Sequence, residues 1–224
     1  MSAPRRLPTV ILISGRGSNL HAILRAVAGQ ALPIAIRAVI SNRPDAPGLT
    51  LARDAGIPAE ILDHTAFPDR QGFDDALQAL IDSHAPELVV LAGFMRILSP
   101  SFVSHYHGRM LNIHPSLLPA FTGLDTHRRA LEAGVREHGA SVHFVTHALD
   151  GGPVVLEARV PVLPGDTAAT LGARVLEAEH RIYPQAIRWF AEGRLRLAGN
   201  AGNEYALLDG KSITPELVAH SEGH

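Results

Sequence analysis

Cysteine is absent from this chain, which excludes a disulfide framework and any thiolate that could bind metal or act as a nucleophile. Long apolar runs are absent as well. The run at residues 10–13 is far too short for the core of a signal peptide or for a membrane span. Because a chain without cysteine is compatible with a reducing compartment, we expect a soluble, cytoplasmic protein.

Neither sign of charge predominates, since 20 lysine and arginine residues stand against 22 acidic residues and the two signs are interspersed. The net charge therefore gives no reason to expect a nucleic acid or a membrane as a partner. All but one of the cationic residues are arginine, which suits bidentate recognition of anions. Any anionic ligand would have to be held by such local groups.

The usual nucleotide-binding motifs are incomplete. The Gly-rich turn at residues 15–20 has leucine in place of the third glycine of the dinucleotide fingerprint, and Ser41-Asn42 stands where a ribose-binding acid is expected. No Gly-Lys-Ser/Thr is present, which excludes a Walker A loop. What remains is a glycine turn at a helix N-terminus that offers backbone N–H groups to one phosphate. The alternative is a tight turn in which Ser18 or Asn19 merely caps the helix.

Short apolar runs alternate with segments of helical periodicity over the first half of the chain. The predicted strands are residues 10–14, 34–40, 59–62, 88–91 and 110–113, and the predicted helices are residues 20–28, 48–55 and 73–84. This alternation predicts an α/β, Rossmann-like fold with a mostly parallel, twisted sheet and helices on both faces. A chain of 224 residues fits a single domain of this kind.

The second half predicts two antiparallel strands, a long helix and a small antiparallel C-terminal extension, over residues 141–145, 154–160, 167–190 and 194–224. An Asp-Gly-Gly turn at Asp150 would join the two strands, and Asp166 or Thr167 would cap the helix. We expect the catalytic core to span about residues 9–193 and the extension to end in a frayed tail from residue 215.

The most informative motif places Asn112 and His114 at the end of the predicted strand 110–113. Side chains two residues apart leave a strand on one face, so an amide donor and an imidazole are presented together. Such a pair can stabilise a developing oxyanion, and Asp150 alongside would favour the cationic imidazole and fix its tautomer. The reaction class indicated is acyl or formyl transfer. Alternatively, Asn112 and His114 only satisfy a strand end and a turn, and the Asp-Gly pair at Asp150 is hairpin turn chemistry.

The loop after the predicted strand 88–91 carries an apolar rim of Met95, Ile97 and Leu98 beside Arg96. At the carboxyl end of a parallel strand, this rim would suit a flat heteroaromatic ring with a carboxylate tail. The alternative is a core-packed loop with a solvated arginine. No histidine has a partner at metal-ligand spacing and no clustered carboxylates occur, so we expect no catalytic metal.

Four segments resemble the folate-dependent formyltransferases of purine biosynthesis. They read Ile-Ser-Gly-x-Gly-Ser-Asn-Leu, Leu-Ala-Gly-Phe-Met-Arg-Ile-Leu, Asn-Ile-His-Pro-Ser-Leu-Leu-Pro and Glu-His-Gly-x-Ser-Val-His-Phe-Val, with a later Asp-Gly-Gly-Pro. The resemblance covers about residues 10–193 and implies the formyltransferase variant of the Rossmann-like fold. Departures follow Pro119, where Ala120-Phe121-Thr122-Gly123 replaces the Lys-Tyr-Pro-Gly that is common in the family, and Asp125 stands in place of histidine.

The resemblance implies that the formyl group of 10-formyltetrahydrofolate is transferred to the amine of glycinamide ribonucleotide. The catalytic positions would be Asn112, His114 and Asp150. The ribonucleotide would be held by Gly17, Ser18, Asn19, Leu20, His21 and Glu179, and the folate cosubstrate by Arg70, Met95, Arg96, Ile97, Leu98 and Asn112. Small-molecule substrates are the expected partners of a monomer or homodimer, without metal, nucleic acid or membrane. Two alternatives remain, a formyltetrahydrofolate hydrolase and a non-enzymatic nucleotide-binding module.

Overall fold

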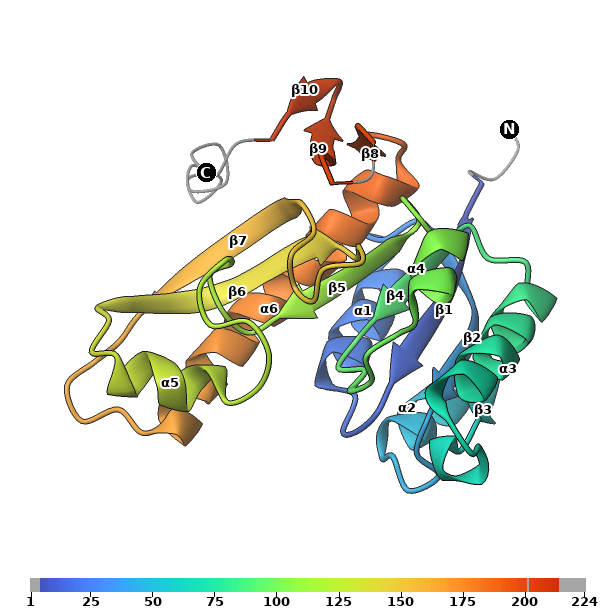
Figure 1. Ribbon diagram of the computed structural model, residues 1–224, viewed down its shortest axis with the longest axis horizontal. Coiled ribbons are helices and arrows are strands. Elements are labelled where there is room, and N and C mark those ends of the chain that lie inside the picture. The colour runs from blue at the N-terminus through green and yellow to red at the C-terminus, as the bar shows by residue number, and fades with distance from the viewer. Residues whose placement is uncertain (1–4, 201, 214–224) are drawn as a thin grey trace. The chain divides into compact units, whose positions relative to one another are not determined.

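The computed structural model describes residues 5–200 and 202–213 (Figure 1). The chain forms two compact units, Met1–Leu111 and Asn112–His224. The first unit alternates strands with helices. The second unit holds an antiparallel strand pair, a long helix and a small separate sheet.

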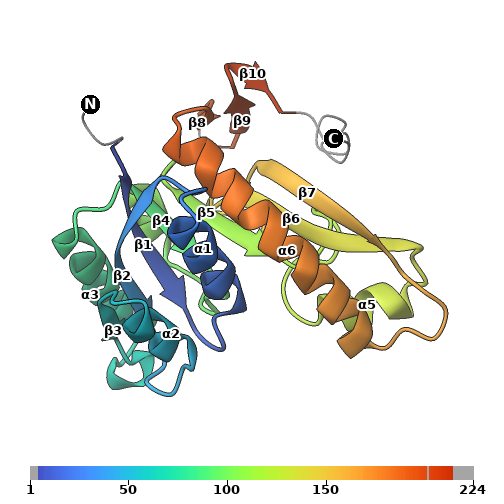
Figure 2. The ribbon, with the colours of Figure 1, turned by 180° about the vertical axis from the view of Figure 1, so that it is seen from behind.

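The described elements of the first unit are β1 (Leu7–Ile13), α1 (Ser18–Ala28), β2 (Ile34–Ser41), α2 (Gly48–Asp54), β3 (Ala59–Ile61), the short 3-10 helix η1 (His64–Ala66), α3 (Arg70–Ser83), β4 (Leu88–Leu91), α4 (Pro100–His105) and the start of β5 (Met110–His114). Strand β1 pairs in parallel with β2 and β4, and β2 pairs in parallel with β3. Helices α1 and α2 cover one face of these strands (Figure 2), and α3 and α4 cover the other (Figure 1).

Strands β1 and β4 are buried on both faces, which explains their continuous apolar sequences. Every residue in Val10–Ile13 and Leu88–Leu91 is at most 5% exposed. Helix α3 adds Phe73, Leu77 and Ile81 to the core from one helical face, as the i, i+4 spacing predicts. Burying a side chain of this size stabilises the fold by roughly 1.5–3 kcal/mol.

The sheet of the first unit has a topological switch point between β1 and β4. The chain runs outward from β1 through β2 to β3 and then returns to pair β4 with β1. Ser14 N–H donates to Gly93 O at 3.1 Å, and Ser14 Oγ accepts from Met95 N–H at 2.8 Å. The Gly-rich turn after β1 and the loop after β4 are thereby joined where open α/β sheets bind ligands.

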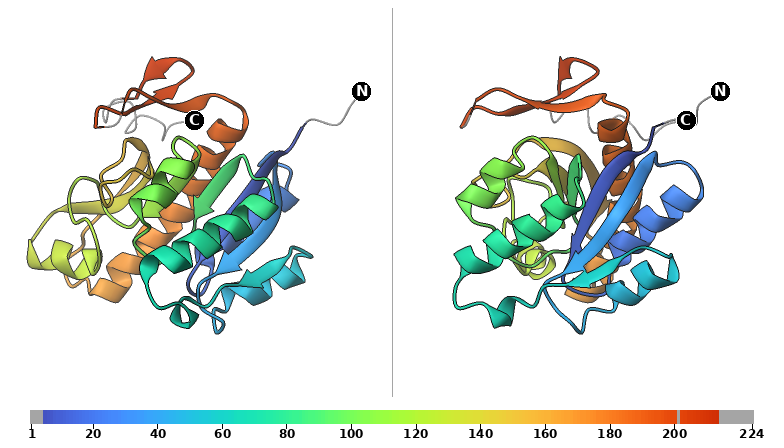
Figure 3. Two further views of the ribbon diagram at one scale, coloured as in Figure 1. Left: turned by 45° about the vertical axis from the view of Figure 1, so that its right-hand side comes forward. Right: turned by 90° about the vertical axis from the view of Figure 1, so that its right-hand side faces the viewer.

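The described elements of the second unit, besides the end of β5, are α5 (Thr126–Glu132), β6 (Glu137–Phe144), β7 (Val154–Pro161), α6 (Ala168–Ala191), β8 (Leu195–Ala198), β9 (Tyr205–Leu208) and β10 (Lys211–Ser212). Strands β6 and β7 are antiparallel, and α6 packs against both (Figure 2). The small sheet lies beyond the C-terminal end of α6 (Figure 3). The strand orders are β3-β2-β1-β4-β5-β6-β7 and β10-β9-β8, which confirms the predicted fold class.

Helix α6 begins at a capping box. Thr167 Oγ1 accepts from Thr170 N–H, and Thr170 Oγ1 accepts from Thr167 N–H. Thr167 is therefore the cap, and Asp166 instead forms an ion pair with Arg174 at 2.8 Å. The hydrogen bond from Arg174 holds the pKa of Asp166 well below its usual range. Together these contacts fix where the helix that flanks β6 and β7 begins.

Several boundaries differ from the prediction. Strand β6 begins at Glu137 rather than residue 141, because its antiparallel pairing with β7 starts at Glu137, which lies opposite Pro161. Helices α4 and α5 were not predicted, since six or seven residues carry too weak a periodic signal. The predicted frayed tail lies outside the described residues. No helix within residues 5–200 and 202–213 is long and apolar enough to cross a bilayer.

Candidate active site

The end of β5 presents Asn112 and His114 on one face, as their spacing predicts. His114 is buried, its Nε2 lies 2.9 Å from Phe121 O, and its Nδ1 lies 3.5 Å from Asp150 Oδ2. Carbonyl and carboxylate oxygens accept hydrogen bonds, so both ring nitrogens face acceptors. The cationic imidazole, which carries a proton on each nitrogen, satisfies this environment.

Asp150 reaches the imidazole from the turn between β6 and β7. Its φ of +50° is a left-handed conformation that aspartate tolerates better than most residues. A Cβ atom on Gly152 would lie 1.9 Å from Phe144 O, so the turn requires glycine there. Asp150 Oδ2 also accepts from Gly123 N–H at 2.8 Å. Asp150 thus forms part of the turn and also places a carboxylate beside His114.

A second histidine, which the sequence analysis did not single out, orients the amide of Asn112. His143 is buried, its Nδ1–H donates to Phe144 O at 2.9 Å, and its Nε2 accepts from Asn112 Nδ2 at 3.1 Å. Burial lowers the pKa of His143, which keeps the ring neutral and Nε2 an acceptor. The second N–H of Asn112 Nδ2 remains for a ligand. The signal in the sequence was a histidine inside a predicted buried strand, because such a side chain needs polar partners.

The Pro-Ser-Leu-Leu-Pro segment forms a loop after β5 that is tied to β6. Ser141 Oγ donates to Ser116 O at 2.8 Å and accepts from Leu118 N–H at 3.0 Å. The peptide bond after Leu118 is cis. These buried contacts direct the chain back across the end of β5 and bring Phe121 O to His114.

The departures from the family pattern lie in the next segment, residues 120–125. Phe121 and Asp125 have φ angles of +53° and +56°, a conformation that costs on the order of 1–3 kcal/mol for each such residue. The side chain of Asp125 does not cap α5 but pairs with Arg128 at 2.8 Å. The hydrogen bonds from this segment to His114 and Asp150 come from its backbone, at Phe121 O and Gly123 N–H. The altered side chains therefore leave these two hydrogen bonds intact.

Two further histidines face each other beside this segment. His127 Nδ1 on α5 lies 3.2 Å from His138 Nε2 on β6, so one ring donates and the other accepts. Burial lowers the pKa of His127. Burial, followed by the charges of His127 and His114, lowers the pKa of His138 to about 4. The pair is therefore neutral near pH 7.

The Gly-rich turn of the first unit leads into α1, and the prediction that Ser18 or Asn19 caps this helix is wrong. Helix α1 begins at Ser18, and its N-cap is Gly17, with no side-chain cap. Gly17 has a φ of +76°, and a Cβ atom there would lie 2.9 Å from Gly48 Cα, so only glycine fits. The start of the helix is thus left to backbone donors, as in an anion-binding turn.

The other residues assigned to the ribonucleotide are distributed over both units. In the first unit, Leu20 is fully buried in the core, so only its backbone can contact a ligand, whereas His21 is exposed. In the second unit, Glu179 belongs to the buried face of α6 and is 7% exposed.

The loop after β4 has the character that a flat anionic ligand requires. Met95 and Ile97 are 68% and 56% exposed, which is unusual for large apolar side chains. The guanidinium of Arg96 lies 5.3 Å from the ring centroid of Phe73, and its buried Nε has no hydrogen-bond partner. The alternative of a core-packed loop with a solvated arginine is therefore wrong. Arg70, also assigned to the folate, is exposed at the first position of α3.

Residues 7–187 match the formyl transferase family. The chain is 56% identical over 213 residues to the phosphoribosylglycinamide formyltransferase of Escherichia coli, a match that covers 95% of this chain and 99% of that protein. It is 47% identical over 203 residues to the Haemophilus influenzae protein of the same name, covering 91% and 94%. The chain belongs to the phosphoribosylglycinamide formyltransferase family.

A solved structure of this formyltransferase family, from Coxiella burnetii, shares the fold. It matches with a TM-score of 0.88 and 54% identity, and the match covers 94% of this chain and 97% of that one. The resemblance inferred from the four sequence segments is therefore confirmed for both the family and the fold.

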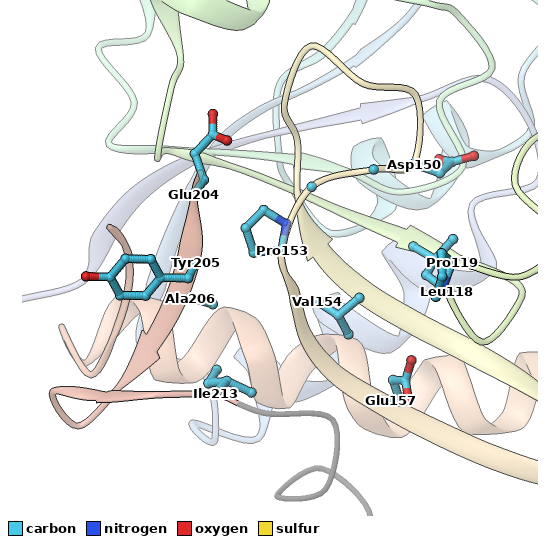
Figure 4. A pocket seen from close by; sticks show the side chains of 12 residues that line it. Leu118, Pro119, Asp150, Pro153, Val154, Glu157, Glu204, Tyr205, Ala206 and Ile213 are labelled. Carbon is cyan, nitrogen blue, oxygen red and sulfur yellow. The ribbon is translucent and has the colours of Figure 1, made fainter. Parts of the chain in front are cut away.

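A cavity of about 320 Å³ adjoins Asp150 of the formyltransferase within the second unit (Figure 4). The Asp150 turn forms one side, and Tyr205, the first residue of β9, lies on the other with Glu204 just before it. Glu157 on β7 also lines the cavity, and burial raises the pKa of its carboxyl group. The turn that carries Asp150 thus borders open space on this side, and Gly123 N–H donates to its carboxylate.

The part of the formyltransferase that the structure describes contains no group of three or more histidine, aspartate and glutamate residues arranged to hold a metal ion. Two sets of predicted site residues are each brought together within one unit. Asn112, His114 and Asp150 meet in the second unit, and the Gly-rich turn meets the Met95 loop in the first.

Proposed function

We propose that this formyltransferase transfers the formyl group of 10-formyltetrahydrofolate to the amine of N1-(5-phospho-D-ribosyl)glycinamide in de novo purine biosynthesis. The products are the N-formyl amide and tetrahydrofolate. Membership of the family supports this reaction. The observation that carries the mechanism is that His114 is enclosed by two hydrogen-bond acceptors, because the resulting imidazolium is a donor toward negative oxygen.

In the proposed mechanism, the substrate amine attacks the formyl carbon, and negative charge develops on the formyl oxygen. Asn112 donates its second Nδ2–H to this oxygen, and His114 donates Nδ1–H, because Nε2–H is held by Phe121 O whereas Nδ1 lies 3.5 Å from Asp150 Oδ2, too far for a strong hydrogen bond. Asp150 stabilises the imidazolium throughout. The amine nitrogen loses a proton and the departing folate nitrogen gains one as the original carbon–nitrogen bond breaks.

The first unit supplies binding groups for both substrates. The turn at Gly17, with Ser18, Asn19, Leu20 and His21, would bind the phosphate and ribose through its backbone donors. Met95, Ile97 and Leu98 would contact the heteroaromatic ring, and Arg96, with its unused donor, and Arg70 would face the anionic tail. In the second unit, Glu179 on α6 would engage the glycinamide end of the ribonucleotide.

We infer that residues 1–224 form one formyltransferase domain that acts on small molecules. We expect a monomer or homodimer in the cytoplasm. The chemistry needs one carboxylate, one imidazolium and one amide, all of which the second unit contains within 4 Å of a neighbouring site residue.

Release of tetrahydrofolate from 10-formyltetrahydrofolate tests the proposal in three reactions, with the ribonucleotide, with its riboside and without an amine. We expect release with the ribonucleotide. The riboside should lose activity mainly in kcat/KM, because unpaired backbone donors in the turn cost on the order of a few kcal/mol. Equal release without an amine would identify a formyltetrahydrofolate hydrolase. Folate binding without release in any reaction would identify a non-enzymatic binding module.

A further inference from the structure

The segment Phe121–Asp125 contacts both ionisable residues of the proposed catalytic site. Its first residue accepts a hydrogen bond from His114 Nε2 at 2.9 Å, through the Phe121 carbonyl. Two residues later, Gly123 N–H donates to Asp150 Oδ2 at 2.8 Å. Because one short segment holds the imidazole from one side and the carboxylate from another, its position sets the geometry of the pair.

Arg129, on the neighbouring helix α5, holds this segment at three points. Its Nη1 donates to Thr122 O at 2.5 Å and to Leu124 O at 3.3 Å, the two carbonyls on either side of Gly123. Its guanidinium also lies 5.7 Å from the ring centroid of Phe121. The arginine therefore contacts the segment immediately around the two backbone groups that meet His114 and Asp150.

The backbone of the segment needs such support. Phe121, Gly123 and Asp125 all have φ between +53° and +79°, and two of them are not glycine. Conformations of this kind persist only where surrounding contacts over-determine them. Arg129 is half-buried and supplies those contacts from Nη1, whose two N–H groups can donate to both carbonyls at once.

The adjacent Arg128 provides an internal contrast. It is exposed, and its ion pairs at 2.8 and 3.4 Å are with the side chains of Asp125 and Glu132. Exposed pairs of this type contribute little. Two arginines next to each other on one helix thus differ in whether they hold the backbone that touches the catalytic pair.

We propose that Arg129 is a positioning residue for formyl transfer, an inference that rests on the proposed function. It touches no reacting atom. Through Thr122 O, Leu124 O and the Phe121 ring, it holds the segment so that Phe121 O meets His114 and Gly123 N–H meets Asp150. Loss of this support lets the imidazole and the carboxylate move relative to Asn112.

The test compares Arg129→Ala, Arg129→Lys and the matched control Arg128→Ala in steady-state kinetics with both substrates. We expect Arg129→Ala to lower kcat roughly 10-fold or more, with KM values changed less than about 3-fold, because misplaced catalytic groups cost rate rather than binding. Arg129→Lys keeps the charge but lacks the planar guanidinium that lies beside the Phe121 ring, so its kcat should lie between those of Arg129→Ala and the wild type. Arg128→Ala should stay within about 2-fold of the wild type.

A pH profile separates positioning from general destabilisation. In Arg129→Ala the dependence of kcat on pH should change, since the contacts of both His114 and Asp150 change, whereas in Arg128→Ala it should match the wild type. The inference is overturned if the two alanine variants have the same kcat, if the pH dependence of kcat in Arg129→Ala matches that of the wild type, or if the loss of kcat only follows the folded fraction measured by circular dichroism. Absence of amine-dependent release in the wild type would instead refute the proposed function.

Discussion

At the scale of single residues, the site depends on how hydrogen-bond donors and acceptors are shared among a few side chains. Asn112 gives one N–H to neutral His143 and keeps the other. His114 is held between Phe121 O and Asp150. Asn112 therefore retains one oriented N–H, whereas Nδ1 of His114 lies 3.5 Å from Asp150 Oδ2, too far for a strong hydrogen bond, and neither side chain can rotate without losing a buried partner.

We predict that Asn112→Ala and His114→Ala each lower kcat by roughly 10²-fold or more, because each removes one donor aimed at the charge of the transition state. Steady-state kinetics and calorimetric titration with substrate would measure this, and substrate binding should survive. His105→Ala, which removes an exposed histidine paired with Asp82, serves as the control. Near-normal turnover in either site variant would rule out the oxyanion role.

Asp150→Asn separates the charge of this residue from its turn role. Asparagine tolerates the left-handed φ of +50° and keeps an acceptor for Gly123 N–H, so the turn should survive. We predict that most activity is lost, since the imidazolium of His114 loses its counter-charge. Asp209→Asn is the matched control, because Asp209 has a φ of +51° in a turn of the small sheet. A fully active Asp150→Asn enzyme with unchanged kcat pH dependence would show that Asp150 acts only in the turn.

At the scale of secondary-structure elements, the connection between β6 and β7 decides where the catalytic carboxylate lies. Phe144 N–H donates to Pro153 O at 3.1 Å, which closes the strand pair just below the turn. Gly152 sits against the carbonyl of Phe144, so the two strands approach more closely than any side chain would allow. The pairing of β6 with β7 thereby fixes the position of Asp150.

We predict that Gly152→Ala both destabilises the protein and lowers kcat. An added Cβ would lie 1.9 Å from Phe144 O, so the strands must separate and carry Asp150 away from His114. Overpacking of this kind costs typically about 1–3 kcal/mol, which urea unfolding would measure. Gly72→Ala is the control, since a Cβ there meets nothing closer than 3.5 Å. If Gly152→Ala had the same stability and kcat as Gly72→Ala, the close approach of the two strands at the turn would not be needed to position Asp150.

At the scale of the whole molecule, buried histidines couple stability to pH. Burial lowers the pKa values of His127, His138 and His143, so folding keeps these rings neutral in acid where the unfolded chain would protonate them. For His138 the pKa falls from 6.5 to about 4. Stability is therefore fully present above about pH 6.5 and is lost as the pH falls toward 4.

We predict that the free energy of unfolding decreases between pH 6.5 and 4, with a slope of up to about 1.4 kcal/mol per pH unit for each proton taken up only by the unfolded chain. Urea titrations at several pH values would measure the slope. His138→Gln removes one such group and should flatten the dependence, whatever its effect on stability at pH 7. A slope identical in the variant and the wild type would contradict the assignment of His138 to this effect.

The sequence by itself determined the features that depend on local periodicity and on residue type. Alternation of apolar runs and helical segments was enough for the α/β fold, because buried parallel strands and amphipathic helices leave different periods in the sequence. Strand parity placed Asn112 and His114 on one face. The glycines at 17 and 152 marked the positions of two turns.

Only the tertiary structure decided which side chains complete these features, because the contacts involved join residues far apart in the chain or in short elements with no periodic signal. The partner of Asn112 lies on another strand, at His143. The support of the segment at Phe121 comes from Arg129, on a helix of seven residues. Glycine rather than a polar side chain stands at the cap of α1, since α2 approaches Gly17 too closely for any Cβ, and no local pattern reports the distance between two helices.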